Sequence, residues 1–125
     1  MSEPSMKPED VLEMMRRSMG EVPAAIEKSV PVDPTFILEH ARSKAFAMPS
    51  QTPALDEQTR TLVYLAAALA GSSPACVRAM ANKVAQQGIA KEKVLETIHI
   101  VRLAMATKII GDSEPVFDAL KKGLA

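Results

Sequence analysis

The chain has 125 residues, which is enough for one domain with a real core. Its 15 basic and 15 acidic residues balance, so it lacks the positive charge expected of a nucleic-acid-binding protein or of a protein held on an anionic membrane. No segment approaches the roughly 20 consecutive apolar residues of a membrane span. We therefore expect a single domain over residues 1–125 with neither nucleic acid nor membrane as a partner.

Composition also predicts how the core is built and where the protein resides. Hydrophobic residues make up 47% of the chain but aromatic residues only 3%, so aliphatic side chains and the eight methionines must fill the core. The first residues, MSEPSMKPEDVLEMM, are partly acidic and lack the apolar centre of a signal peptide. The single cysteine agrees with a reducing compartment. These features favour a cytoplasmic protein.

Prolines and glycines divide the chain into helices, and no useful strand-like alternation occurs. The sequence predicts helices from Pro8 to about Met19, from Pro23 to before Pro31, from Pro34 to about Phe46, from about Leu55 to Ala70, from Pro74 to Gly88, from about Lys91 to Gly111, and after Ser113. Asp56 and Ser73 are expected to cap the two central helices. The fold class is therefore all-α, a bundle of about six helices.

The helix after Lys91 is unusually apolar. One stripe consists of Val94, Ile98, Val101 and Met105. Further apolar residues lie on its other sides, namely Leu95, Ile100 and Leu103. This distribution predicts burial nearly all round, either at the centre of the bundle or at a subunit interface. We expect Phe117, Leu120 and Leu124 to pack the last helix down, and we expect the whole chain to form a homo-oligomer.

The stretch from Leu55 to Val94, LDEQTRTLVYLAAALAGSSPACVRAMANKVAQQGIAKEKV, resembles the central two-helix unit of the carboxymuconolactone decarboxylase and alkylhydroperoxidase D family. The resemblance covers roughly residues 36–120, which leaves residues 1–33 as an N-terminal helical extension. It implies a helical bundle that assembles through its helices, as a trimer or as a hexamer made of two trimers.

The resemblance also identifies the positions of an ancestral active site. Redox members of the family carry a Glu, then C-x-x-C, then a His four residues after the second Cys. Matching this pattern places Thr61 at the Glu, Ser73 at the first Cys, Cys76 at the second Cys and Met80 at the His. Decarboxylase members typically keep the His, which is again Met80 here. The family name therefore does not by itself predict an activity for this chain.

The substitutions remove the chemistry of a dithiol cycle. A thiol reacts as its thiolate, which normally needs a neighbouring base or cation. Thr61 cannot act as a carboxylate base, and Met80 cannot carry a proton. Ser73 cannot resolve a sulfenate into a disulfide, and a chain with one cysteine cannot form an internal disulfide at all. We therefore expect the dithiol peroxidase relay to be lost.

Cys76 remains the best candidate for catalysis. The helix start before it favours a thiolate, whereas the small apolar residues around it favour an inert, buried thiol. His40 or His99 could serve as its proton partner, although neither occupies the family His position. His99 also lies in a row with Glu96 and Arg102, which we interpret as an ion-pair seam between subunits. No spacing of His, Cys, Asp or Glu predicts a metal site, and no motif predicts a cofactor.

Three functional hypotheses follow. In the first, the chain is a binding or structural oligomer of this family without the dithiol relay. In the second, it is a one-Cys peroxidase or thiol reductase, a peroxiredoxin-like antioxidant that uses Cys76 and an external thiol. In the third, it is a thiol-free lyase acting on a small organic acid bound near Arg78 or Arg102. A small-molecule ligand is compatible with all three.

Overall fold

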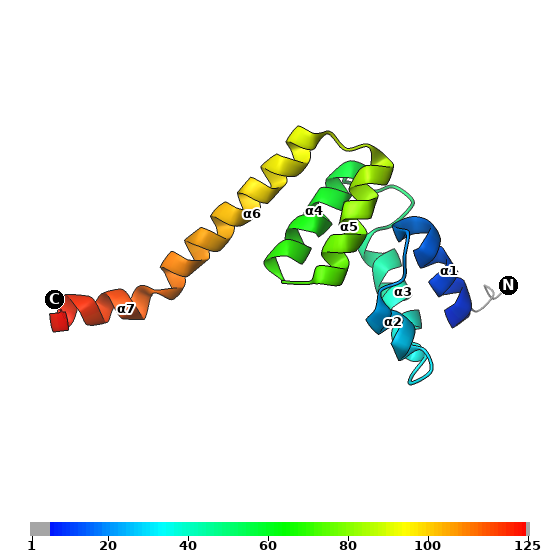
Figure 1. Cartoon of the computed structure of the whole chain (residues 1–125), viewed down its shortest axis with the longest axis horizontal. Helices are drawn as coiled ribbons and strands as arrows, with labels where there is room; N and C mark the ends of the chain where they lie inside the picture. Colours follow the sequence, from blue (N-terminus) through cyan, green and yellow to red (C-terminus); the bar gives the residue numbers. More distant parts are fainter. Residues whose placement is uncertain (1–5, 125) are drawn as a thin grey trace.

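The computed structural model describes residues 6–124, which are helical and contain no strand (Figure 1). The elements in chain order are α1 (Pro8–Met19), α2 (Ala24–Ser29), α3 (Thr35–Ala47), α4 (Glu57–Ala70), α5 (Pro74–Gln87), α6 (Lys91–Asp112), α7 (Glu114–Ala119) and a π-helical turn (Leu120–Leu124). The predicted all-α fold class is confirmed.

Proline and glycine set the ends of α1 and α5. A proline at the first helical position costs nothing, because its missing N–H would have no partner inside the helix. Pro8 begins α1, and Gly20 ends it with a φ of +82° while its N–H donates to the Arg16 carbonyl. Pro74 begins α5, and Gly88 ends it with a φ of +62°. Both glycines adopt the left-handed conformation that side chains disfavour.

The two predicted N-caps behave differently. Asp56 caps α4, since its Oδ1 accepts a hydrogen bond of 2.8 Å from the Thr59 N–H. Ser73 occupies the corresponding position of α5, but its hydroxyl makes no capping hydrogen bond, so that part of the prediction is wrong. The backbone explains the difference, because ψ is 165° at Asp56 but only 90° at Ser73, whose N–H is held by the Ala68 carbonyl at 3.0 Å.

The core lies where α1, α3, α4 and α5 meet. Its buried residues are Val11, Met15, Met19, Ile37, Leu65, Ala79 and Met80. Three of these seven come from α1, so this N-terminal helix is part of the core rather than an appendage. The Asn82 side chain of α5 also donates a hydrogen bond of 2.8 Å to the Met19 carbonyl at the end of α1. This bond fixes α1 against α5.

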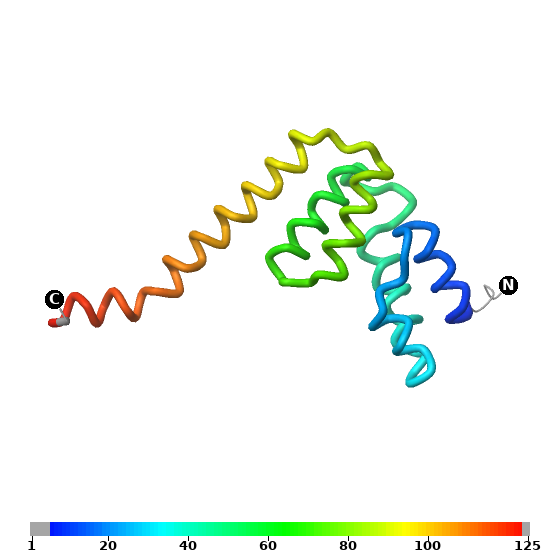
Figure 2. The backbone as a smooth tube through the Cα atoms, viewed as in Figure 1, coloured from blue at the N-terminus to red at the C-terminus, as the bar shows by residue number. Residues whose placement is uncertain are grey.

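Helix α6 departs from this arrangement. It contacts α4, then runs away from the other helices and carries α7 at its far end (Figure 1). The tube in Figure 2 shows that α1 and α7 lie at opposite ends of the molecule. Gly111 does not break the helix, which continues to Asp112. Within residues 6–124, no helix is both long and apolar enough to cross a bilayer.

The predicted burial of α6 at the centre of a bundle is wrong. None of its residues is buried, and Ile100 and Leu103 are 60% and 68% exposed. Phe117 and Leu120 are also exposed, so they do not pack the last helix onto the core. Most of the apolar surface of α6 therefore has no partner among residues 6–124. Its alternative interpretation, a subunit interface, stays a prediction.

Candidate functional site

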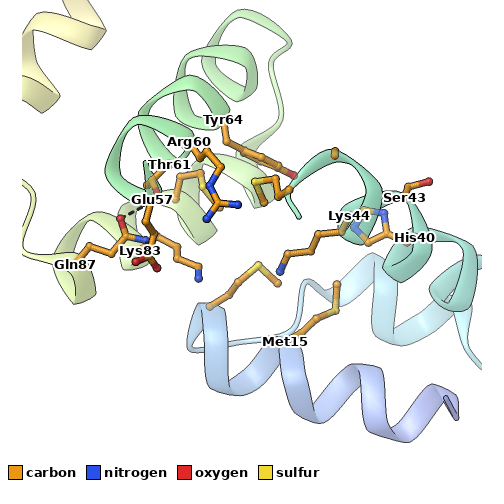
Figure 3. Close-up of a pocket in the computed structure, with 14 residues that line it drawn as sticks. Met15, His40, Ser43, Lys44, Glu57, Arg60, Thr61, Tyr64, Lys83 and Gln87 are labelled. Carbon is orange, nitrogen blue, oxygen red and sulfur yellow. Dashed lines mark hydrogen bonds between the residues drawn. The ribbon is translucent and has the colours of Figure 1, made fainter. Parts of the chain in front are cut away.

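Four helices enclose a cavity of about 380 Å³ (Figure 3). This volume lies within the usual range for small-molecule sites, roughly 300–1,000 Å³. Helix α4 contributes Glu57, Arg60, Thr61 and Tyr64. Helix α5 contributes Met80, Lys83 and Gln87. Helix α3 and the residue after it contribute His40, Ser43, Lys44, Ala47 and Met48, and α1 contributes Met15 and Met19.

Thr61 anchors a short polar network on one wall of the cavity. It is buried, and its hydroxyl donates to the Gln87 side-chain oxygen at 3.0 Å. The Gln87 amide nitrogen in turn donates to a Glu57 carboxylate oxygen at 3.3 Å. The hydroxyl that the resemblance places at the Glu position is therefore already engaged in joining α4 to α5.

The cavity carries an excess of positive charge. Lys44, Arg60 and Lys83 line it, against the single carboxylate of Glu57. Burial of the Lys44 amine lowers its pKa, and the positive charge of Lys83 lowers it further. Lys44 taken as a whole residue is nevertheless exposed, so part of it reaches solvent. Such a lining favours a negatively charged ligand.

Arg60 is the residue whose bonding is incomplete. Its Nη1 donates to the Pro49 carbonyl at 3.0 Å, which holds the guanidinium in place. Its Nε is buried, and no group in residues 6–124 accepts a hydrogen bond from it. Leaving a buried donor unpaired costs about 1–3 kcal/mol, and more when the donor is charged. Arg60 also lines the cavity, so an anion held there would lie beside this guanidinium.

Cys76 lies beside the cavity rather than in it. The half-buried thiol is 3.5 Å from the Tyr64 hydroxyl, and Tyr64, not Cys76, lines the cavity. The tyrosine therefore stands between the sulfur and the cavity. Its hydrogen bond with Cys76, together with partial burial, raises the pKa of Tyr64 to about 12. At neutral pH the phenol keeps its proton and cannot act as a base toward the thiol.

The other predicted site residues are divided between the cavity and the surface. Met80 and His40 line the cavity together with Thr61. Ser73 lies outside it, next to a shallow hollow that Pro74 and Arg78 also line. Seven residues of helix separate Ser73 from Met80, which is roughly 10 Å along the axis. The α5 residues that line the cavity begin at Met80 and end at Gln87, so Ser73 lies beyond the end of that lining.

The predicted row on α6 lies far from this site. His99 and Arg102 are exposed and do not line the cavity. No ion pair joins them or Glu96 within the part of the chain that the structure describes. Arg78, the other arginine considered for an organic acid, instead pairs with Glu21 at 3.7 Å. None of these groups offers a free anchor inside a cavity.

Sequence reasoning missed Arg60, Lys44 and Lys83. A signal for Arg60 was present, because Glu57, Arg60, Thr61 and Tyr64 follow the i, i+3, i+4, i+7 spacing of one helical face. That face contains Thr61, which the resemblance had already assigned to the site. The lysines carry no such signal, since their convergence depends on how α3 and α5 pack. Among residues 6–124, no three His, Cys, Asp or Glu side chains are grouped as metal ligands.

Comparison with known proteins supports the resemblance on which these positions rest. The model of the carboxymuconolactone decarboxylase family matches residues 38–108, which include α4, α5 and most of α3 and α6. A search of curated proteins found no match. Because the family model covers more than half of the sequence, the chain belongs to the carboxymuconolactone decarboxylase family.

Proposed function

We propose that this family member has lost the dithiol peroxidase relay and binds a small anionic ligand in the cavity between α1, α3, α4 and α5. The buried and unpaired Nε of Arg60 is the observation that carries the proposal. A carboxylate matches a guanidinium in charge and geometry, and hydrogen bonds between charged groups are the strong ones. Lys83, from the neighbouring helix α5, adds a second cation to the lining.

The rest of the cavity indicates what the remainder of the ligand is like. Met15, Met19, Met48 and Met80 line it, with the Tyr64 ring beside them. Methionine is apolar, flexible and polarizable, so it adapts to ligands of different outline and makes favourable contacts with aromatic rings. The site therefore fits an organic acid with a compact apolar or aromatic body.

The loss of the relay has independent support. Thr61 is engaged with Gln87, and Met80 provides no proton carrier where relatives carry His. Tyr64 covers the side of Cys76 that faces the cavity and remains protonated at neutral pH. A thiol in these surroundings has neither a base nor a resolving cysteine. Binding in the cavity needs none of the missing groups.

Calorimetric titration of the purified protein tests the proposal. We use phenylacetate and its neutral counterpart phenylacetamide as probes, with the variants Arg60→Gln and Lys83→Gln. Phenylacetate should bind at least tenfold more tightly than the amide, and each variant should lose at least tenfold, which corresponds to about 1.4 kcal/mol. Arg102→Gln, at an exposed position outside the cavity, is the matched control and should bind like the parent.

Two outcomes contradict the proposal. Equal binding of the acid and the amide would mean that charge recognition is absent. A loss in Arg102→Gln as large as in Arg60→Gln would mean that the acid binds through general charge and not in the cavity. Because Arg60 also bonds the Pro49 carbonyl, its variant could unfold locally. The parent Lys83 makes no hydrogen bond or ion pair within residues 6–124, so Lys83→Gln should not disturb the fold and keeps the test decisive.

A one-Cys peroxidase is the second candidate, and one observation favours it. The hydrogen bond between Tyr64 and Cys76 could stabilise a thiolate once formed. Catalytic consumption of hydrogen peroxide with an external thiol, abolished in Cys76→Ser, would establish this function. We expect no such turnover.

A further inference from the structure

Two lysines enter the cavity from opposite walls. Lys44 extends from α3 and Lys83 from α5, and their amino groups point toward one another (Figure 3). Neither makes a hydrogen bond or an ion pair with any group in residues 6–124. Two ammonium groups that face each other without a carboxylate between them are unfavourable, and loss of one proton relieves the repulsion.

Around Lys44 the cationic and apolar groups outnumber the single carboxylate, that of Glu57. His40 is on the same helix, Glu57 and Arg60 face the cavity from α4, and α1 offers only methionines. The net surroundings are therefore cationic and partly apolar. Both conditions disfavour the ammonium form of Lys44 and lower its pKa, with burial as the larger cause and Lys83 as the second. The unprotonated amine is the nucleophilic form.

We propose that Lys44 forms a reversible imine with the carbonyl carbon of a small oxo acid whose carboxylate is held by Arg60 and Lys83. This inference rests on the proposed function, because it uses the same cavity and the same anchor. The Lys44 nitrogen forms a bond to the carbonyl carbon, and the carbonyl oxygen leaves as water with the two amine protons. No oxidant, reductant or metal takes part in the step.

The placement of the three cations divides their roles. A guanidinium matches a carboxylate in charge and geometry, so Arg60 can anchor the carboxylate. Lys83 faces Lys44, so it both attracts the acid and favours the free amine of its neighbour. Lys44 is exposed as a whole residue, whereas Arg60 and Lys83 are half-buried, so Lys44 is the most accessible of the three to an incoming carbonyl compound. An oxo acid carries both a carboxylate for Arg60 and a carbonyl carbon for Lys44 in one molecule.

Trapping with cyanoborohydride tests the proposal on the full chain. The probe is benzoylformate, which differs from phenylacetate by a carbonyl group in place of a methylene. Intact-mass and peptide analysis should show one adduct per chain, on Lys44, with the mass of the acid plus two hydrogens minus one water. Lys44→Arg keeps the positive charge but should lose at least nine-tenths of the adduct. Lys91→Arg, at an exposed lysine outside the cavity, should not change it.

The trapping rate should also rise with pH along a curve whose midpoint lies below the value of an ordinary lysine, about 10.4. Labelling that spreads evenly over surface lysines, that falls on Lys83, or that persists in Lys44→Arg would overturn the proposal. If phenylacetate binds but benzoylformate cannot be trapped, the imine is refuted while anion binding stands. If phenylacetate does not bind in calorimetry, the proposed function fails on its own evidence.

Discussion

Cys76 and Tyr64 show that the neighbours of a thiol, and not only its position, decide whether it can react. The thiol keeps its place on the second central helix, but the phenol of Tyr64 lies 3.5 Å from it on the side of the cavity. Reactivity of a thiol depends on access and on thiolate character. Here the half-buried thiol contacts the Tyr64 hydroxyl, and within residues 6–124 no base makes a hydrogen bond with the sulfur.

This arrangement predicts slow alkylation of the native protein. Cys76 should react with a thiol reagent much more slowly before denaturation than after it. Tyr64→Ala should speed the native reaction at least tenfold, whereas Tyr64→Phe, which keeps the ring, should change it little. Rapid labelling of the parent protein at neutral pH would instead make Cys76 the centre of an active site. Cys76→Ala should cost about 1 kcal/mol or less, because a small side chain leaves almost no cavity.

Restoring one motif residue should not restore peroxidase activity. Ser73→Cys would re-create the C-x-x-C spacing, but Thr61 and Met80 still supply no proton relay. We expect no disulfide-coupled peroxide turnover with a dihydrolipoyl donor, even if the two thiols can be oxidised to a disulfide. The matched control is the triple variant with Thr61→Glu and Met80→His added. Turnover in Ser73→Cys alone would contradict the account of the lost relay.

At the scale of single elements, the start of α4 depends on Asp56. Its carboxylate accepts the Thr59 N–H, and this hydrogen bond lowers the pKa of Asp56. A carboxyl whose pKa is lower in the folded state stabilises the fold above its ordinary pKa, and that contribution disappears as pH falls through the lowered value. Asp56→Ala should therefore lower Tm at pH 7. The loss of Tm should become smaller once the pH falls below the ordinary pKa of an aspartate, about 3.9.

Asp56→Asn is the control for this prediction. Its amide oxygen can still accept the Thr59 N–H, so most of the capping should survive at pH 7 without the pH dependence of the carboxylate. Thermal unfolding followed by circular dichroism across this pH range measures both effects. Equal Tm values for the parent and Asp56→Ala at pH 7 would show that the cap does not stabilise α4.

The helices were predictable because residues at their own ends determine where they begin and end. Proline lacks an N–H donor, and glycine tolerates a positive φ. These local properties set the limits of α1 at Pro8 and Gly20 and of α5 at Pro74 and Gly88. The error at Ser73 arose because capping depends on a backbone angle that the residue type does not determine. The cavity was not predictable for a similar reason. The convergence of Lys44 and Lys83 depends on the rotation of α3 against α5, which no local pattern specifies.

At the scale of the whole molecule, α6 is the feature that one chain does not explain. It exposes a series of large apolar side chains while α1, α3, α4 and α5 bury theirs. Exposed apolar patches of this kind mark interaction surfaces. The apolar pattern around the whole circumference of α6 follows if it packs between copies of the chain. We therefore retain the prediction of a homo-oligomer, a trimer or a hexamer, with α6 near the contact.

Light scattering tests this prediction with one pair of variants. The parent protein at micromolar concentration should give a mass at least twice the 13.4 kDa of one chain. Leu103→Glu places a charge on the exposed apolar surface of α6 and should shift the mass toward that of one chain. Ala24→Glu introduces the same charge on α2, away from α6, and should leave the mass unchanged. A parent protein that is monomeric would contradict the interpretation of α6.

The central claim is that the cavity between α1, α3, α4 and α5 holds an anion through Arg60. A crystal structure of the protein with phenylacetate tests it most directly. The account predicts a carboxylate oxygen within about 2.7–2.9 Å of Arg60 Nε, the usual length of a hydrogen bond between opposite charges, with the ring among the methionines. An acid bound elsewhere, or an Arg60 Nε that donates to a group of its own chain while the cavity holds no acid, would contradict it.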